Sequence, residues 1–119
     1  WQWNNNSITQ TQNDITTVMN QVDFIYDRDC DVSFQIGTII VTTALVYTTN
    51  DPNGLLGEFS SNWSTNYVGI QRNIAHLFTG RNLTGSTIGI AYLSVVCSQT
   101  NGYGLSRWRA CRHPRPCRC

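Results

Sequence analysis

The C-terminal residues gather side chains that zinc prefers. Cys111, His113, Cys117 and Cys119 form the pattern C-x-H-x₃-C-x-C, and thiolates and imidazoles are common zinc ligands. The spacing differs from the paired C-x₂-C knuckles that close a tetrahedral site, and no helix or strand is predicted around it. The five arginines of residues 107–119 also oppose a cation. We therefore expect a tail without ordered structure and no metal site.

The other histidine, His76, lies between Ala75 and Leu77 on a segment that favours a strand. Its ten neighbours on either side include no acid, cysteine or second histidine. A catalytic or metal-binding histidine needs such partners. The sequence therefore predicts a structural role for His76, as a partly buried, hydrogen-bonded or strand-edge imidazole.

The acidic run DFIYDRDCD is the remaining candidate for cation binding. Asp23 and Asp27 are four residues apart and share a helix face, with Asp29 and Asp31 close behind. No oxygen-rich loop of the calcium type follows, so a solvated helix face is the better interpretation. The chain also has no phosphate-binding glycine loop and no G-x-S-x-G elbow. The residues alone therefore assemble no catalytic site.

Composition favours an extracellular protein. Hydrophobic residues make up 40% of the 119 residues, charged residues only 13%, and lysine is absent. Residues 1–106 hold three arginines against seven acids, whereas residues 107–119 hold five arginines and no acid. Apart from Trp108 this basic tail has no aromatic residue, and no predicted fold supports it, so we expect no nucleic-acid partner. The longest apolar stretch, GTIIVTTALVY, is far shorter than the ~20 residues of a membrane span, so we expect no membrane partner.

The hydrophobic pattern predicts a single α/β domain in which helices and strands follow one another. A helix is expected from Thr11 to about Asp29, with Thr11 and Asp14 as its start signal. The β-branched run 32–41 predicts a strand with a short continuation at 44–49. DPNG at 51–54 predicts a turn with Gly54 free to take a positive φ. The remaining expectations are a helix carrying Leu55, Phe59, Trp63 and Tyr67 on one stripe, a strand at 73–80, a turn at 81–86 and a strand at 87–97.

Three segments fit the acceptor pattern for N-linked glycosylation. They begin at Asn5, Asn62 and Asn82. Because the chain is rich in Asn, Ser and Thr, chance matches are expected. The pattern supports a surface location for these segments.

The run IAHLFTGRNLTGSTIGIAYLSVVC, followed by NGYGLS at 101–106, resembles the reprolysin-like (adamalysin-type) zinc metalloendopeptidases of the metzincin group. The resemblance covers about residues 8–106. It implies the upper subdomain of that fold, an incomplete α/β unit with a mixed twisted sheet and two helices. Residues 1–106 would then be a partial metalloprotease domain, and residues 107–119 an Arg/Cys-rich tail.

The resemblance also implies a binding site. The strand from Thr87 to Leu93 would border the active-site cleft, and a peptide or protein substrate would lie antiparallel to it. The substrate-binding backbone would be that of Ile88, Gly89, Ile90 and Ala91. An edge strand offers unpaired N–H and C=O groups to an extended chain, and Gly89 would allow a close approach. Cys97 matches a family cysteine that pairs with one beyond the catalytic helix.

The sequence departs from the family pattern at the zinc-binding motif. The family motif H-E-x-x-H-x-x-G-x-x-H has no counterpart after Ser106, and Glu58 is the only glutamate. We therefore expect no catalytic or metal-binding residues in this chain, although the parent family uses zinc. The leading interpretation is an inactive fragment of a secreted metalloendopeptidase with a frame-shifted tail. The alternative is a non-catalytic protein that binds extended peptides along the edge strand.

Overall fold

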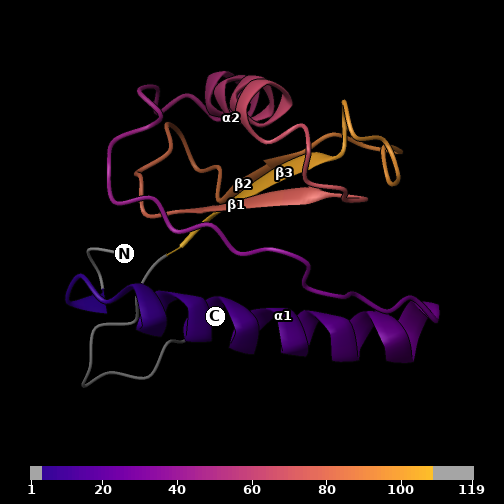
Figure 1. The fold of residues 1–119 in the computed structure, drawn as a ribbon. Coiled ribbons are helices and arrows are strands. Elements are labelled where there is room, and N and C mark those ends of the chain that lie inside the picture. Colours follow the sequence, from indigo (N-terminus) through magenta and orange to yellow (C-terminus); the bar gives the residue numbers. More distant parts are fainter. Residues whose placement is uncertain (1–3, 109–119) are drawn as a thin grey trace. The chain divides into compact units, whose positions relative to one another are not determined.

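The computed structural model describes residues 4–108, and Figure 1 shows its two helices and three strands. The chain divides into two compact units between Leu45 and Val46. The first unit contains helix α1 (Ile8–Cys30). The second contains helix α2 (Pro52–Asn66) and the strands β1 (Ala75–Thr79), β2 (Gly89–Ala91) and β3 (Tyr103–Arg107).

Helix α1 begins earlier than the sequence predicts. The side chain of Ser7 accepts a hydrogen bond from the N–H of Gln10 at 3.2 Å, so Ser7 is the N-cap and the predicted start at Thr11 is wrong. Thr11 instead donates its hydroxyl to the carbonyl of Ser7, one turn back. The helix ends where Asp31 takes a left-handed conformation with φ of 54°. No residue of α1 is buried.

The strand predicted at 32–41 does not form, nor does its continuation at 44–49. A strand requires a partner for its backbone groups, and within residues 4–108 this segment joins no sheet. The N–H of Phe34 bonds instead to the carboxylate of Asp23. Val32 and Leu45 are 45% and 81% exposed. The β-branched composition is therefore present without the pairing that would make it a strand.

Helix α2 begins inside the segment predicted as a turn. Asp51 is its N-cap and accepts from the N–H of Gly54 at 2.7 Å, while Pro52 occupies the first turn. Gly54 is thus helical rather than a positive-φ turn residue. A proline is favourable there because first-turn N–H groups have no helical partner. The predicted stripe is confirmed in its first two members, since Leu55 and Phe59 are buried.

The three strands form one mixed sheet in the order β1-β3-β2. β1 runs parallel to β3 and pairs Ala75 with Tyr103, whereas β2 runs antiparallel and pairs Ile90 with Leu105. The predicted α/β class is confirmed, with an open sheet and two helices. β3, the central strand, was not predicted from the residues.

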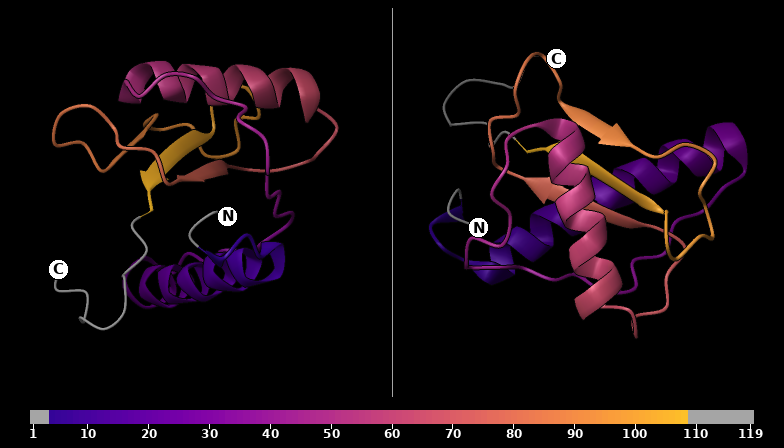
Figure 2. Two further views of the ribbon diagram at one scale, coloured as in Figure 1. Left: turned by 90° about the vertical axis from the view of Figure 1, so that its left-hand side faces the viewer. Right: turned by 90° about the horizontal axis from the view of Figure 1, so that it is seen from above.

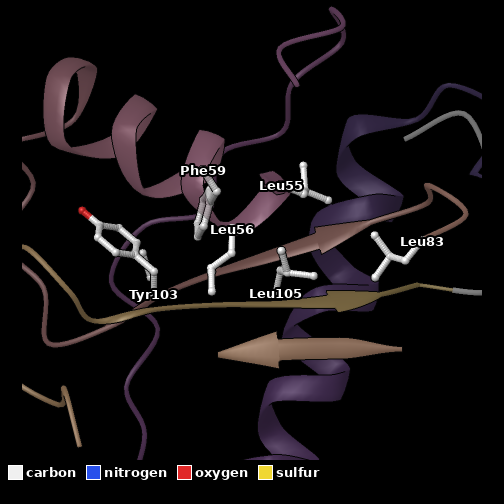
Figure 3. Close-up of a cluster of buried hydrophobic side chains, with 7 residues drawn as sticks. Leu55, Leu56, Phe59, Leu83, Tyr103 and Leu105 are labelled. Atoms are coloured by element: carbon white, nitrogen blue, oxygen red, sulfur yellow. The ribbon is translucent and has the colours of Figure 1, made fainter. Parts of the chain in front are cut away.

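Helix α2 covers one face of this sheet (Figures 1 and 2). The core between them consists of aliphatic and aromatic side chains no more than 6% exposed, which are Leu55, Leu56, Phe59, Ala75, Leu83, Tyr103 and Leu105 (Figure 3). Phe59 makes edge-to-face contacts with Tyr103 and Trp63 at centroid distances of 5.6 and 5.9 Å. The core therefore fixes the central strand, and the central strand positions β2.

Candidate substrate-binding edge

β2 lies at an edge of the sheet, because it pairs only with β3 among the described strands. It is shorter than the strand predicted at 87–97, with ladder pairing from Gly89 to Ala91. Ser94 takes a left-handed conformation with φ of 58°, which turns the chain out of the extended path. The edge that could accept a peptide is therefore short.

Along β2, residues whose backbone groups bond to β3 alternate with residues whose backbone groups face away from it. Arg107 donates its N–H to the carbonyl of Ile88 at 2.7 Å. Tyr92 donates its N–H to the carbonyl of Tyr103 at 3.1 Å. In an antiparallel pair such bonded positions alternate with non-bonded ones, so the backbone of Ile90 also faces β3.

The backbone N–H and C=O groups of Gly89 and Ala91 consequently point to the open side of β2. Apart from the β2–β3 pairing itself, no backbone hydrogen bond within residues 4–108 engages these groups. Of the four residues predicted to bind substrate, these two therefore offer their backbone to an added strand. Ile88 and Ile90 direct theirs to β3, although the side chain of Ile88 is 76% exposed.

Gly89 has a structural requirement of its own. A Cβ atom at this position would lie 2.9 Å from the carbonyl oxygen of Leu105 and 3.4 Å from the hydroxyl of Ser106. The first of these is a backbone atom of the paired strand and cannot turn away. Close pairing of β2 with β3 therefore accounts for a glycine here, whatever lies on the open side.

His76 and Ser106 meet on the sheet face opposite α2. The Nε2 atom of His76 lies 3.0 Å from the hydroxyl of Ser106. Its ring packs beside Phe78 at a centroid distance of 4.8 Å. His76 is exposed overall, but partial desolvation of its ring lowers the pKa of the imidazole below its ordinary value. The expected hydrogen-bonded strand histidine is therefore present, and Ser106 is its partner.

Cys97 lies in a polar pocket of about 360 Å³ lined by Gln71, Arg72, Asn73 and Gln99. Its thiol accepts a hydrogen bond from the side-chain amide of Asn73 at 3.4 Å. Cys97 is exposed and forms no disulfide within residues 4–108, and the same holds for Cys30. An exposed thiol here is compatible with the pairing that the resemblance implies.

Three of the four candidate aspartates, Asp23, Asp27 and Asp29, already have local partners, and so does the only glutamate. Asp27 accepts from Ser33 and Asp29 pairs with Arg28 at 2.6 Å. Glu58 accepts from the hydroxyl of Thr48 at 2.6 Å and from its N–H at 2.8 Å, and these bonds lower the pKa of Glu58. The only glutamate is therefore used to hold a loop.

Within residues 4–108, no three His, Cys, Asp or Glu side chains lie close enough together to hold a metal ion. The tail residues Cys111, His113, Cys117 and Cys119 lie outside the described residues. The described residues thus form a short strand edge with free backbone groups, but they offer no set of ligands that fits a zinc ion.

A sequence profile of the reprolysin-like metallopeptidases of family M12B matches residues 12–112. That is most of the 119 residues, and it includes α2, the three strands and most of α1. The chain belongs to this family. No curated protein matches the chain.

Membership in the reprolysin-like family brings two general properties. The family is zinc-dependent, and its members are typically secreted or extracellular. Among the described residues, neither helix has the length and apolarity that a membrane crossing requires. The family match extends from the first unit through the whole sheet, so the edge strand β2 lies well inside it.

Sequence reasoning on this reprolysin-like chain missed β3 and the pairing of His76 with Ser106. A signal for β3 was available, because Tyr103 and Leu105 alternate with Gly104 and Ser106. The two glycines at 102 and 104 obscured it, since glycine weakens a strand prediction. A side chain at position 104 would be crowded, because a Cβ atom there would lie 3.1 Å from the Cβ atom of Ala91 and 3.3 Å from the imidazole ring of His76.

Proposed function

We propose that this chain supplies the substrate-binding edge of a secreted zinc-dependent metalloendopeptidase and does not hydrolyse peptide bonds by itself. The observation that carries the proposal is the free backbone of Gly89 and Ala91 on β2, within a chain of a metallopeptidase family. An extended peptide adding antiparallel to β2 would satisfy these groups. Hydrolysis in the family needs zinc, and the 119 residues contain no H-E-x-x-H motif.

The alternative function is a non-catalytic protein that captures extended peptides along the same strand. The same geometry of Gly89 and Ala91 favours it, because binding by β-augmentation needs no metal. Sequencing the transcript past the codon of Ser106 in all three frames separates the two. An H-E-x-x-H-x-x-G-x-x-H motif in another frame supports the protease, and its absence from every frame supports the binder.

Peptide binding is tested with Ala91→Pro, which removes the outward N–H without touching the bonds to β3. Proline is tolerated on an edge strand where the N–H faces solvent, so far-UV circular dichroism should be unchanged. We expect the fluorescence anisotropy of fluorescein-labelled denatured casein to rise when it binds the natural chain. Its binding to Ala91→Pro should be at least tenfold weaker. Ala91→Gly retains the N–H and serves as the control.

Two outcomes would contradict this proposal. Equal binding by the natural chain and Ala91→Pro would show that β2 is not the binding edge. Release of acid-soluble fluorescence from the casein, with or without added zinc, would show that the chain hydrolyses peptides without the family motif.

A further inference from the structure

The side chains of β2 differ in character between the two faces of the sheet. We propose that the β2 edge selects extended peptides that carry apolar side chains at every second position. This inference rests on the proposed function, because it specifies which peptides the same edge binds. It makes Ile88, Ile90 and Tyr92 the residues that determine specificity.

The apolar side chains of β2 lie on the sheet face that α2 covers. Ile90 pairs with Leu105 and packs against the core beneath α2. Successive residues of a strand alternate between the two faces of the sheet, so Ile88 and Tyr92 share the face of Ile90. Ile88 is 76% exposed and Tyr92 is 42% exposed. These three side chains form an apolar row that an added strand can contact.

The other face of β2 carries almost no side chain. Gly89 has none and Ala91 has a single methyl group, and their partners on β3 are Ser106 and Gly104. A residue of an added strand on this face would meet only these small groups. The sequence of the peptide is therefore little restricted at the positions that face Gly89 and Ala91.

The hydrogen-bond pattern brings the peptide closest at the apolar positions. The outward N–H and C=O groups belong to Gly89 and Ala91, so an antiparallel peptide would form its hydrogen-bonded pairs there. Its residues opposite Ile88, Ile90 and Tyr92 would occupy non-hydrogen-bonded pairs. In such pairs the Cα atoms lie about 4.5 Å apart, compared with about 5.5 Å in bonded pairs. The closest side-chain contacts therefore fall on the apolar row.

The ends of β2 limit the length of peptide that is selected. Backbone bonding to β3 extends from Ile88 to Tyr92. Beyond it Ser94 takes a φ of 58°, and before it Gly85 takes a φ of 72°, so the chain leaves the extended path on both sides. The selected pattern is therefore apolar-x-apolar-x-apolar.

Charge would be the other basis for selection. Within residues 59–108 the sequence has three arginines and no acid. Each of these arginines already donates hydrogen bonds to a neighbouring loop, Arg72 to Gln99, Arg81 to Asn50 and Arg107 to Asn82. The exposed groups beside the open backbone of β2 are thus apolar, and the selection that they favour is apolar.

The test is fluorescence anisotropy of three fluorescein-labelled peptides, KKVTVTVKK, KKTTTTTKK and KKVQVQVKK, titrated with the 119-residue chain. Their lysines keep them soluble and away from the basic residues 107–119. We expect KKVTVTVKK to bind about tenfold more tightly than KKTTTTTKK, because three cross-strand pairs become apolar. KKVQVQVKK differs only at the positions that face Gly89 and Ala91, and its affinity should lie within about threefold of that of KKVTVTVKK.

A substitution in the apolar row tests the same preference from the side of the chain. Ile88→Thr keeps a β-branched side chain, which suits a strand, but removes most of its apolar surface. It should reduce the preference for KKVTVTVKK over KKTTTTTKK by about threefold. Leu93→Thr is the matched control, because Leu93 is 87% exposed and lies beyond the part of β2 that pairs with β3. It should leave the preference unchanged.

The outcomes separate this inference from the proposed function. Equal binding of KKVTVTVKK and KKTTTTTKK, weakened for both by Ala91→Pro, would overturn the inference and leave β2 as the binding edge. A preference that Leu93→Thr removes and Ile88→Thr retains would also overturn it. Failure of every peptide to bind, or binding that Ala91→Pro leaves unchanged, would overturn the proposed function and this inference with it.

Discussion

At the scale of single residues, the register of two parallel strands holds His76 against Ser106. β1 and β3 pair His76 with Gly104 and Phe78 with Ser106. The missing side chain of Gly104 leaves room for the imidazole, which reaches the hydroxyl of Ser106 two residues further along β3. The ring is thus placed by backbone pairing together with a glycine.

The partly desolvated environment of His76 predicts that its ring titrates at a lower pH in the folded chain than in the unfolded chain. Desolvation lowers the pKa of His76 in the folded chain relative to about 6.5 in the unfolded chain. Between these two values the unfolded chain binds more protons, so the contribution of His76 to folding stability is complete above about pH 6.5 and is lost as the pH falls from there toward the pKa of the folded chain. We expect the ring resonances of His76 to titrate at lower pH in buffer than in concentrated urea.

The variant His113→Gln assigns the ring resonances, because it removes those of the other histidine and leaves only those of His76. Ser106→Ala tests the hydrogen bond separately from the desolvation. A pKa of His76 that is equal in buffer and urea, or higher in buffer, would contradict the environment described.

At the scale of elements, the pairing of β2 with β3 depends on Gly89. A Cβ atom there would meet the carbonyl oxygen of Leu105 at 2.9 Å, so Gly89→Ala should force the two strands apart. We expect a loss of about 1–3 kcal/mol in the free energy of unfolding, as for other overpacked sites. Urea denaturation followed by circular dichroism measures it.

Gly69→Ala is the control for this prediction, because a Cβ at Gly69 meets no atom within 4 Å. It should change the free energy of unfolding by no more than about 0.5 kcal/mol. A similar loss in both variants would mean that backbone flexibility, rather than the contact with Leu105, explains the effect.

The sequence pattern predicted α1, α2 and β1 from the periodicity of their side chains, although α1 begins earlier than predicted. The Leu55 and Phe59 stripe identifies α2, and the alternation around His76 identifies β1. The run at 32–41 has an equally good strand composition, but strand formation depends on a partner that local pattern does not reveal. For the same reason the edge position of β2 came from the family resemblance and not from its residues.

At the scale of the whole molecule, burial is concentrated in the second unit. All the buried hydrophobic side chains among the described residues come from α2, the strands and the Leu83 loop. Helix α1 instead exposes Phe24 and Ile25 to 66% and 47%. The two units should therefore differ in how much each side chain contributes to cooperative folding.

Two phenylalanine truncations on helices test this difference. Phe59→Ala removes a ring that is 2% exposed and packed against Tyr47, Trp63 and Tyr103. Such a loss costs about 3–5 kcal/mol, a large part of the total of about 5–15 kcal/mol for a domain. Phe24→Ala removes a mostly exposed ring and should change the free energy of unfolding by no more than about 0.5 kcal/mol.

The measurement is urea unfolding monitored by tryptophan fluorescence, to which Trp63 contributes directly beside Phe59. We expect Phe59→Ala to lose the cooperative transition or to shift it to much lower urea, while Phe24→Ala retains the natural midpoint. Comparable losses in the two variants would show that α1 contributes to the stability of the folded chain as much as the α2 core does. The reverse order would place the stabilising core in the first unit.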